Sequence, residues 1–286
     1  HLSVFLCEQD DLASKTSSSS TKLIHGGLRY LEQFDFKMVK KSLEERQKLL
    51  RLAPHLVKPL PLILPHAKGM RPLWILRLGL FIYDHLSSKN RLPKSLLVKK
   101  NKYPSYFKPL QSHIFKGFRY YDCSTNDSRL TITNALQAEK HGAVIRPRSK
   151  LIHATVCDNL WHLTLLKNDG EKYIIKARTV INATGPWARH SNEILNIKQH
   201  HQLALVKGSH FVVDKLYHGD HAYFLQHEDK RLLFVIPYHQ YTMIGTTDVQ
   251  VNDFKELSVS EDEIDYLLEI TNKYFKTQLD RSHRSS

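Results

Sequence analysis

The sequence predicts a mixed α/β (α+β) fold in which a parallel-sheet part is interleaved with an antiparallel part. The apolar stretches 2–7 and 178–183 end at Glu8 and just before Thr184-Gly185, as buried parallel strands often do. Alternating apolar and polar residues over 143–176 and 232–246 indicate antiparallel strands. The 286-residue length permits one large domain or two ordinary ones.

Three helices follow from capping signals and apolar spacing. They are expected over 36–53, 126–140 and 261–275. Asp35 can cap the first helix and Pro54 ends it, while Ser260 and Glu263 have capping-box spacing at the start of the last one. Between the first two helices, a proline-punctuated segment predicts loops, short strands and one apolar element.

The remaining strands are predicted from period-two alternation. A meander is expected over 143–145, 152–157, 161–166 and 173–176, followed by a strand at 178–183 and a hairpin of 232–237 with 241–246.

Residues 17–32, SSSSTKLIHGGLRYLE, are the strongest candidate for a ligand-binding loop. Gly26-Gly27 is the only adjacent glycine pair in the chain, and such a pair can adopt positive φ and approach a flat ligand closely. The upstream hydroxyls can hold a phosphate, and Arg29 can fork two hydrogen bonds onto another. A Ser-rich linker leading into a helix would explain the same composition.

Two strand ends and two histidines are further candidates. Glu8 stands where a dinucleotide-binding fold holds ribose hydroxyls, although a solvated strand end is the simpler interpretation. The motif INATGPW at 181–187 can place backbone without side chains at the sheet edge where open α/β folds bind ligands. The alternative interpretation is a strand that simply ends in a turn. His25 and His210 each lie close to a glycine in a segment that can line a pocket.

Cysteine usage and hydropathy restrict the class of protein. The three cysteines are far apart and none forms a C-x-x-C pair, so we expect a reduced intracellular protein with no metal site. The chain shows no signal peptide and no apolar run of eighteen residues, so no transmembrane span is predicted.

The net charge of +14 comes from one region, since residues 37–119 hold 19 Lys or Arg against 3 acids. This excess would attract nucleic acid, anionic lipid or a phosphorylated substrate. Within it, MRPLWILRLGLFIYDHL at 70–86 resembles an element that lies on a membrane surface. A buried helix or strand pair with two snorkelling arginines fits equally well, and nucleic acid ranks lower because no reading motif is present.

Seven motifs follow one another in an order that points to a known family. They are SSSSTKLIHGGLRYLE at 17–32, APHLVKPLPLILPH at 53–66, LGLFIYDHL at 78–86, INATGPW at 181–187, LVKGSHFVV at 205–213, QHEDKRLLFVIP at 226–237 and IGTTDV at 244–249. Together they resemble the FAD-dependent, quinone-linked glycerol-3-phosphate dehydrogenases of the D-amino-acid-oxidase-like flavoprotein group. The similarity extends from Leu2 to about Arg281.

The resemblance implies a Rossmann-like FAD-binding domain interleaved with an antiparallel-sheet substrate domain, incomplete at both ends. The resemblance assigns FAD binding to residues 1–60 and 126–200. It assigns a basic insertion, facing the substrate or a membrane, to 61–125, and the substrate-domain sheet with its terminal helix to 201–286. Family members begin with a Gly-rich turn, so about 25 to 30 further residues are expected before His1, and others after Arg281. Without that turn, we expect the chain alone to bind FAD weakly or not at all.

The resemblance also assigns roles to single residues. Those implied for FAD are Glu8, Thr16, Ser17, Ser20, Thr21, Lys22, Leu23, Gly26, Gly27, Ala183, Thr184 and Gly185. Those implied for substrate and catalysis are His25, Arg29, Tyr30 and His210. Arg29 would bind the substrate phosphate, and one of the two imidazoles would take the C2 hydroxyl proton.

The implied reaction oxidises sn-glycerol 3-phosphate to dihydroxyacetone phosphate, with hydride passing from C2 to flavin N5 and electrons to a membrane quinone. The implied partners are the substrate, the quinone and an anionic membrane surface, with a homodimer as one option and no nucleic acid. The implied location is peripheral, on the cytoplasmic side of a bacterial inner membrane, or the cytoplasm. The alternatives are an oxygen-using glycerol-3-phosphate oxidase and a non-catalytic membrane-binding remnant.

Overall fold

The computed structural model describes residues 2–67, 69–88, 90–199, 201–227, 231–252 and 258–283. The chain forms two units, each built from segments that are distant in the sequence. Unit 1 comprises 1–20, 126–205 and 250–255, and unit 2 comprises 21–125, 206–249 and 256–286. The chain therefore enters unit 2 at Thr21, inside the range 1–60 that the sequence assigns to FAD binding.

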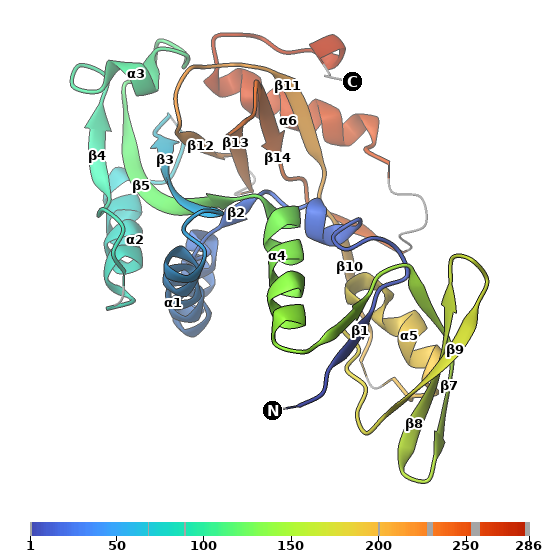
Figure 1. The fold of residues 1–286 in the computed structure, drawn as a ribbon. Coiled ribbons are helices and arrows are strands. Elements are labelled where there is room, and N and C mark those ends of the chain that lie inside the picture. Colours follow the sequence, from blue (N-terminus) through green and yellow to red (C-terminus); the bar gives the residue numbers. More distant parts are fainter. Residues whose placement is uncertain are drawn as a thin grey trace. The chain divides into compact units, whose positions relative to one another are not determined.

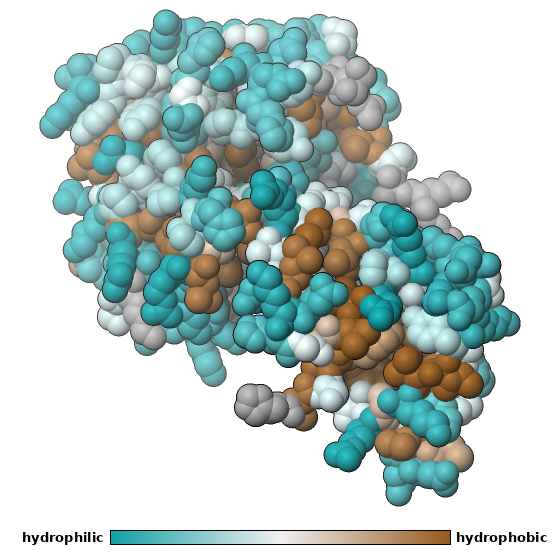
Figure 2. All heavy atoms as spheres, in the orientation of Figure 1, coloured by the Kyte–Doolittle hydropathy of each residue, from teal (hydrophilic) through white to brown (hydrophobic). Residues whose placement is uncertain are grey.

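Unit 1 contains a parallel strand pair, as the sequence predicts. β1 (Phe5–Cys7) lies beside β6 (Val144–Arg146), which follows α4 (Asp127–Lys140) directly (Figure 1). The expected burial of the first strand is wrong. Figure 2 shows apolar surface over β1, where Val4 and Leu6 are exposed, because β6 is the only strand that pairs with β1 within the described residues.

The meander is confirmed as a separate antiparallel sheet in unit 1. Its order is β7-β8-β9, formed by Ser149–Cys157, Leu160–Lys167 and Lys172–Ala177. Residues 143–145 belong to the parallel pair instead. The strand expected at 178–183 is wrong, because an apolar run becomes a strand only if a neighbour supplies ladder hydrogen bonds, and the described part of the chain shows none there. η3 (Gly185–Trp187) and α5 (Ala188–Ile194) follow.

Unit 2 is built on an eight-stranded sheet of order β11-β14-β13-β12-β3-β5-β2, with β4 also paired to β5 (Figure 1). The strands are β2 Leu23–Ile24, β3 Val57–Pro65, β4 Leu96–Lys99, β5 Lys116–Thr125, β11 His210–Asp214, β12 Ala222–Gln226, β13 Leu232–Tyr238 and β14 Tyr241–Gly245. The predicted hairpin is β13 with β14. The segment before β11 contains β10 (Leu205–Lys207), which pairs with β15 (Val249–Val251).

Strand β3 accommodates three prolines although it lies between two other strands. Pro59, Pro61 and Pro65 occupy alternate positions, and β5 pairs along the whole of β3. In an antiparallel ladder only every second residue turns its N–H toward a given neighbour, so the residues between the prolines can supply the bonds. The parallel pairing with β12 is confined to Leu62 and Ile63.

Helices cover both faces of this sheet, and period-two alternation decides which core each strand residue joins. On β3, Leu62 and Leu64 pack with α1 (Phe36–Leu52) and α2 (Leu73–His85). Ile63 instead packs in the second core, with α3 (Pro104–Phe107) and α6 (Glu261–Tyr274). The result is a three-layer unit.

The predicted helix starts are confirmed. The Asp35 carboxylate accepts a hydrogen bond from the Met38 amide (3.0 Å), and Ser260 with Glu263 forms the complete capping box of α6. Within the residues that the structure describes, no helix has the length and apolar character needed to cross a membrane.

Candidate active site

The ligand-loop candidate, residues 17–32, is a structured connection from unit 1 into unit 2. η1 (Thr16–Ser18) lies in unit 1, whereas β2 joins the edge of the large sheet by pairing with β5. Gly27 then adopts a left-handed φ of 74° and leads into η2 (Leu28–Gln33). The segment therefore contains regular structure of its own, which the alternative of a Ser-rich linker does not require.

A buried ionic network lies behind Gly26. Asp122 on β5 forms an ion pair with Arg46 of α1, and their side chains are 2% and 0% exposed. The Asp122 carboxylate also accepts hydrogen bonds from the Tyr83 hydroxyl (2.7 Å) and the Gly26 amide (3.2 Å). Because a buried charge is tolerated only when it is paired and hydrogen-bonded, these contacts bind the Gly26 backbone to the protein interior.

The titration behaviour of this network favours a fixed arrangement. Burial raises the pKa of Asp122, and the adjacent charge of Arg46 opposes that rise. Burial also raises the pKa of Tyr83 well above its ordinary value. The phenol therefore stays protonated at neutral pH, so it can donate to Asp122 while its oxygen accepts from the Gly26 amide at 2.7 Å.

The two glycines are required by the protein itself for different structural reasons. A Cβ on Gly26 would lie 2.3 Å from Cδ2 of Leu43 and 2.6 Å from the Tyr83 hydroxyl, so its close approach is to the protein itself. Gly27 needs its positive φ, and a Cβ there would lie 2.6 Å from the Tyr30 ring.

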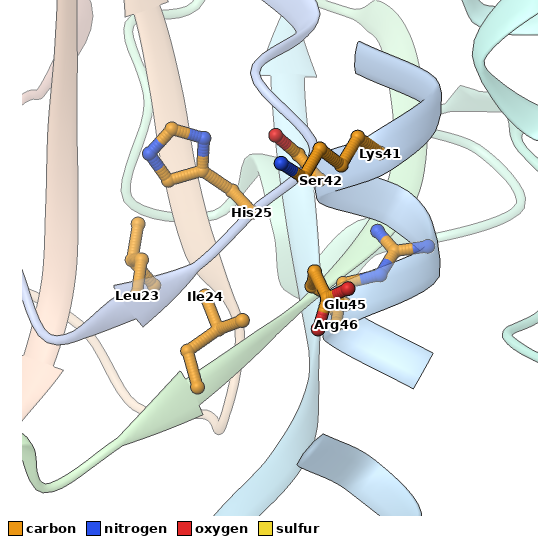
Figure 3. Close-up of a pocket in the computed structure, with 7 residues that line it drawn as sticks. All are labelled: Leu23, Ile24, His25, Lys41, Ser42, Glu45 and Arg46. Carbon is orange, nitrogen blue, oxygen red and sulfur yellow. The ribbon is translucent and has the colours of Figure 1, made fainter. Parts of the chain in front are cut away.

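His25 is exposed and lines a cavity of about 370 Å³. Figure 3 shows it on the segment that follows β2, whereas Lys41, Ser42, Glu45 and Arg46 come from α1. The Nδ1 atom of His25 accepts the Gly27 amide at 3.1 Å. A neutral imidazole that accepts at Nδ1 carries its proton on Nε2, so this ring offers a donor to a ligand.

Arg29 and Tyr30 lie on η2, and Arg29 lines a second cavity of about 270 Å³ together with Asp248 and Arg231. The Arg29 guanidinium is 3.7 Å from the Asp248 carboxylate. Of the two described cavities, His25 lines one and Arg29 the other. Neither of these two cavities is lined by both predicted substrate residues.

His210 is brought close to a predicted cofactor residue. Its Nε2 atom lies 3.2 Å from the Thr21 hydroxyl, although the two residues are far apart in the sequence. A Cβ on Gly245 would lie 2.3 Å from the His210 ring, so this glycine is required by the imidazole. The neighbouring Lys22 has a φ of 57°, and Leu23 lines the His25 cavity.

A cluster around Glu263 was not predicted from the sequence as part of a site. The buried Glu263 carboxylate accepts hydrogen bonds from Ser209 (2.8 Å) and Thr247 (2.7 Å), and Lys207 is 2.6 Å away. Burial would raise the pKa of Glu263, but these contacts and the Ser260 amide lower it to about 2. The sequence signal for Glu263 was the capping box alone. The two other segments that reach its carboxylate, 207–209 and Thr247, are distant in the sequence and give no local signal.

The predicted FAD residues of unit 1 lie at strand ends and in turns. The Glu8 carboxylate accepts the Asp10 amide at 3.0 Å, which directs the turn after β1. Ser20 donates through its hydroxyl to Asp127 (2.7 Å), while Thr16 and Ser17 are exposed.

The second group of predicted FAD residues precedes η3. Ala183, Thr184 and Gly185 are exposed, and Gly185 has a φ of 57° with nothing within 4 Å of where a Cβ would lie. Exposed backbone with open space beside it, a carboxylate at the end of a parallel strand and the exposed hydroxyls of Thr16 and Ser17 are the donors and acceptors that a dinucleotide requires. The residues present therefore fit such a cofactor.

Comparison with known proteins gives consistent matches over the chain. A family model described as FAD dependent oxidoreductase (DAO) matches residues 1–286. The chain is 48% identical to glycerol-3-phosphate dehydrogenase of Pseudomonas aeruginosa over 281 residues, which cover 97% of this chain and 54% of that protein. It is 41% identical to D-erythritol 1-phosphate dehydrogenase of Brucella abortus over 286 residues, covering 98% and 56%. The chain thus spans about half the length of the curated relatives it matches.

Among solved structures, glycerol-3-phosphate dehydrogenase from Bacillus halodurans, complexed with FAD, matches with a TM-score of 0.77 and 25% identity. The match covers 99% of this chain and 50% of that one. It confirms the predicted mixed α/β fold of an FAD-dependent oxidoreductase.

Proposed function

The chain belongs to the family of FAD-dependent oxidoreductases, and from that premise we propose that the protein oxidises sn-glycerol 3-phosphate to dihydroxyacetone phosphate. The observation that carries the proposal is the 48% identity to a glycerol-3-phosphate dehydrogenase over 97% of the chain. The relative named for D-erythritol 1-phosphate supports the same substrate class, because both compounds are polyol phosphates. Since the chain spans about half of these relatives, the activity of the whole protein is part of the proposal.

The residues of unit 2 supply substrate contacts in this proposal. Arg29, on η2, offers a forked guanidinium to the phosphate. His25 presents Nε2–H, which can donate to an oxygen of the substrate while Nδ1 holds the Gly27 amide. Removal of the C2 hydroxyl proton is assigned to an imidazole, with His25 and His210 as the two candidates. For His25 this role requires an unprotonated Nε2 atom, so the proton moves to Nδ1 and the contact with the Gly27 amide is given up.

The residues of unit 1 supply contacts to FAD. Glu8 would accept from ribose hydroxyls, the exposed turn at Thr16-Ser17 would contact the diphosphate, and the backbone at 183–185 would lie against the cofactor. When bound, FAD supplies the acceptor for the hydride that leaves C2.

The test is flavin reduction and turnover in a protein extended at both ends to the length of the relatives, with the present chain in excess FAD beside it, since this chain alone is expected to bind FAD weakly. We expect sn-glycerol 3-phosphate to bleach the flavin absorbance, and a quinone analogue to reoxidise it faster than oxygen does. The same assay with D-erythritol 1-phosphate measures substrate choice. Bleaching by erythritol phosphate alone would contradict the proposed substrate, and reoxidation by oxygen at the higher rate would favour an oxidase.

We further propose that the protein rests peripherally on an anionic membrane through α2. Trp74, Leu78 and Phe81 are 67%, 52% and 58% exposed and, at helical spacing, share one face of this helix. Arg77 is exposed on the same helix, within the region that carries the whole positive excess. Apolar side chains flanked by cationic ones suit the headgroup layer of an anionic bilayer, where a quinone would be reached.

Sedimentation with liposomes tests this surface. We expect the chain to sediment with phosphatidylserine-containing vesicles, and the variant Trp74→Ser with Phe81→Ser to remain in solution. The matched control is Phe34→Ser with Leu52→Ser, which removes two side chains of 78% and 71% exposure outside α2. Equal loss of binding in both double variants would refute a specific role of α2.

A further inference from the structure

A row of residues crosses four neighbouring strands of the large sheet in unit 2. The strands β11, β14, β13 and β12 follow one another in this order (Figure 1). His210 on β11 is directly opposite Gly245 on β14, Gly245 is opposite Phe234 on β13, and Phe234 is opposite Phe224 on β12. Directly opposed residues of antiparallel strands project from the same face of a sheet. The row therefore faces the core that α1 and α2 cover, to which Phe224 belongs.

Gly245 leaves room for the imidazole of His210 inside this row. A Cβ on Gly245 would lie 2.3 Å from Cδ2 and 2.9 Å from Cγ of His210, so the ring occupies the space in which a side chain of β14 would stand. The imidazole thus leans from β11 across β14, toward the strand that carries Phe234. Neighbouring strands are about 4.8 Å apart, so a single strand spacing separates Gly245 from Phe234.

The second candidate imidazole reaches the same phenyl ring from the other end of the sheet. His25 follows β2, which stands at the opposite end of the strand order from β11. The centroid of the His25 ring lies 6.1 Å from that of Phe234, with an angle of 39° between the two planes. Phe234 is therefore an apolar residue that both candidate imidazoles adjoin.

The ring of Phe234 marks the point at which the core ends. Phe224, opposite it, and Ile236, two residues further along β13, are 4% and 5% exposed, whereas Phe234 is only half-buried. The rings of Phe224 and Phe234 stack with their centroids 4.7 Å apart and 25° between their planes. A ring that rests on a buried neighbour in a close-packed core cannot move aside without disturbing that core. Phe234 thus presents a fixed apolar surface beside two polar imidazoles.

Such a surface suits the carbon skeleton of a polyol. Carbon-bound hydrogens pack against an aromatic ring, while the imidazoles can bond to the hydroxyl groups. Because the ring is fixed, it limits how far the carbon chain can extend. One carbon more or less against a close-fitting apolar wall changes kcat/KM by about 10- to 200-fold.

We propose that Phe234 sets the chain length of the polyol phosphate that the protein accepts, by closing the site beyond the reacting carbon. The proposal deepens the proposed function and rests on it, because it takes His25 and His210 as residues that contact the substrate. A three-carbon polyol ends before this ring, whereas a four-carbon polyol collides with it. A smaller side chain at this position should therefore admit the longer compound.

The test is the ratio of kcat/KM for D-erythritol 1-phosphate to kcat/KM for sn-glycerol 3-phosphate, measured with the FAD-loaded protein extended to the length of its relatives. We expect Phe234→Ala to raise this ratio about tenfold or more, and Phe234→Leu to raise it less. Both values come from one preparation, so the ratio does not depend on the fraction of the variant that folds. An unchanged ratio in Phe234→Ala would overturn the proposal.

The variant Phe211→Leu is the matched control for Phe234→Leu. Phe211 follows His210 on β11, but it is 3% exposed and packs in the other core, on the opposite face of the sheet. This control should leave the ratio unchanged. A rise as large as that of Phe234→Leu would show that any loosening of the sheet relaxes substrate choice, and it would overturn the proposal.

Binding to the protein with its flavin reduced beforehand separates this proposal from the proposed reaction. A reduced flavin cannot accept hydride, so the ratio of the dissociation constants of the two polyol phosphates reports the shape of the site alone. If this ratio changed as expected in Phe234→Ala while glycerol phosphate reduced no flavin in the oxidised protein, the proposed reaction would fail and the role of Phe234 would stand. Flavin reduction by glycerol phosphate with the same ratio in wild type and variant would have the opposite meaning.

Discussion

Asp122 holds the backbone that carries His25. Its carboxylate is the common partner of Arg46, Tyr83 and the Gly26 amide, and none of these groups is accessible to water as an alternative partner. The position of His25 is set by the next residue, Gly26, whose amide is fixed in this network. A residue that touches no ligand can therefore determine where a candidate catalytic imidazole lies.

Replacing Asp122 by Ala should destabilise the protein by roughly 3–5 kcal/mol, because it leaves Arg46 buried without a counter-ion. Urea unfolding followed by circular dichroism measures the change. The control Asp11→Ala removes an exposed carboxylate paired with Arg148 and should change stability far less, because solvent screens this pair. Similar losses of stability in the two variants would show that the buried ion pair stabilises the protein no more than the exposed one does.

Substitution of the two imidazoles separates their roles. Whichever of His25→Gln and His210→Gln removes the proton acceptor should lower kcat by about 10²–10⁴-fold. The other should mainly raise KM, since it loses a substrate contact. The measurement is the steady-state rate at several pH values with the FAD-loaded chain. Unchanged kcat in both variants would contradict proton transfer by either residue.

Helix α6 is coupled to the segments around it through its first turn. Glu263 completes the capping box with Ser260, and it also accepts from Ser209 and Thr247 and pairs with Lys207. One carboxylate thus joins a helix start to the loops after β10 and β14. These loops also supply Gly208 and Thr246 to the cavity that Arg29 lines.

The pH dependence of stability should reveal this coupling. The pKa of Glu263 in the folded protein is about 2, below its ordinary value of 4.5, so its contribution is complete above about pH 4.5 and is lost as the pH falls to about 2. The contribution is roughly 3 kcal/mol. Glu263→Gln should therefore lower the unfolding free energy at pH 7 by about that amount and flatten its decline below pH 5.

The control for this prediction is Glu171→Gln. Glu171 is exposed and pairs with Lys167, four residues earlier, across the turn between β8 and β9. Loss of this carboxylate should change stability by about 0.5 kcal/mol or less. If the unfolding free energy of Glu263→Gln fell below pH 5 as steeply as that of the wild type, the acid dependence could not be assigned to Glu263.

The two units differ in how much apolar surface they bury. Of the buried apolar side chains in the described chain, only Ala154, Leu165 and Leu195 lie in unit 1. Unit 2 contains both hydrophobic cores, on the two faces of its sheet. Because burial is the main source of stability, unit 2 should be the more stable part of the chain.

Amide hydrogen exchange tests this difference. We expect the amides of β3 and β5 in unit 2 to exchange at least about 100-fold more slowly than those of β1 and β6 in unit 1, since a gap of about 3 kcal/mol in opening free energy has that effect. Added FAD should slow exchange in unit 1 if the predicted contacts of Glu8 and Thr16 form. Equal protection in the two units would contradict the argument from burial.

Local signals were enough to predict α1, α4 and α6, but not α2, α3 and α5. Asp35, Ser260 and Glu263 act within one turn of the helices that they cap, so their spacing in the sequence is their geometry. The strand expected at 178–183 failed because pairing with a neighbour is not a local property. The expected burial of β1 failed for the same reason.

The sequence by itself determined the family, the candidate residues and the capped helices, because each depends on residues close together in the chain or on motifs in a fixed order. Only the tertiary structure placed His25 and Arg29 at different cavities, paired Arg46 with Asp122, and brought Arg231 beside Arg29. Such contacts join segments tens to hundreds of residues apart. Their geometry is set by the packing of the sheet and its helices, for which a single sequence carries no local signal.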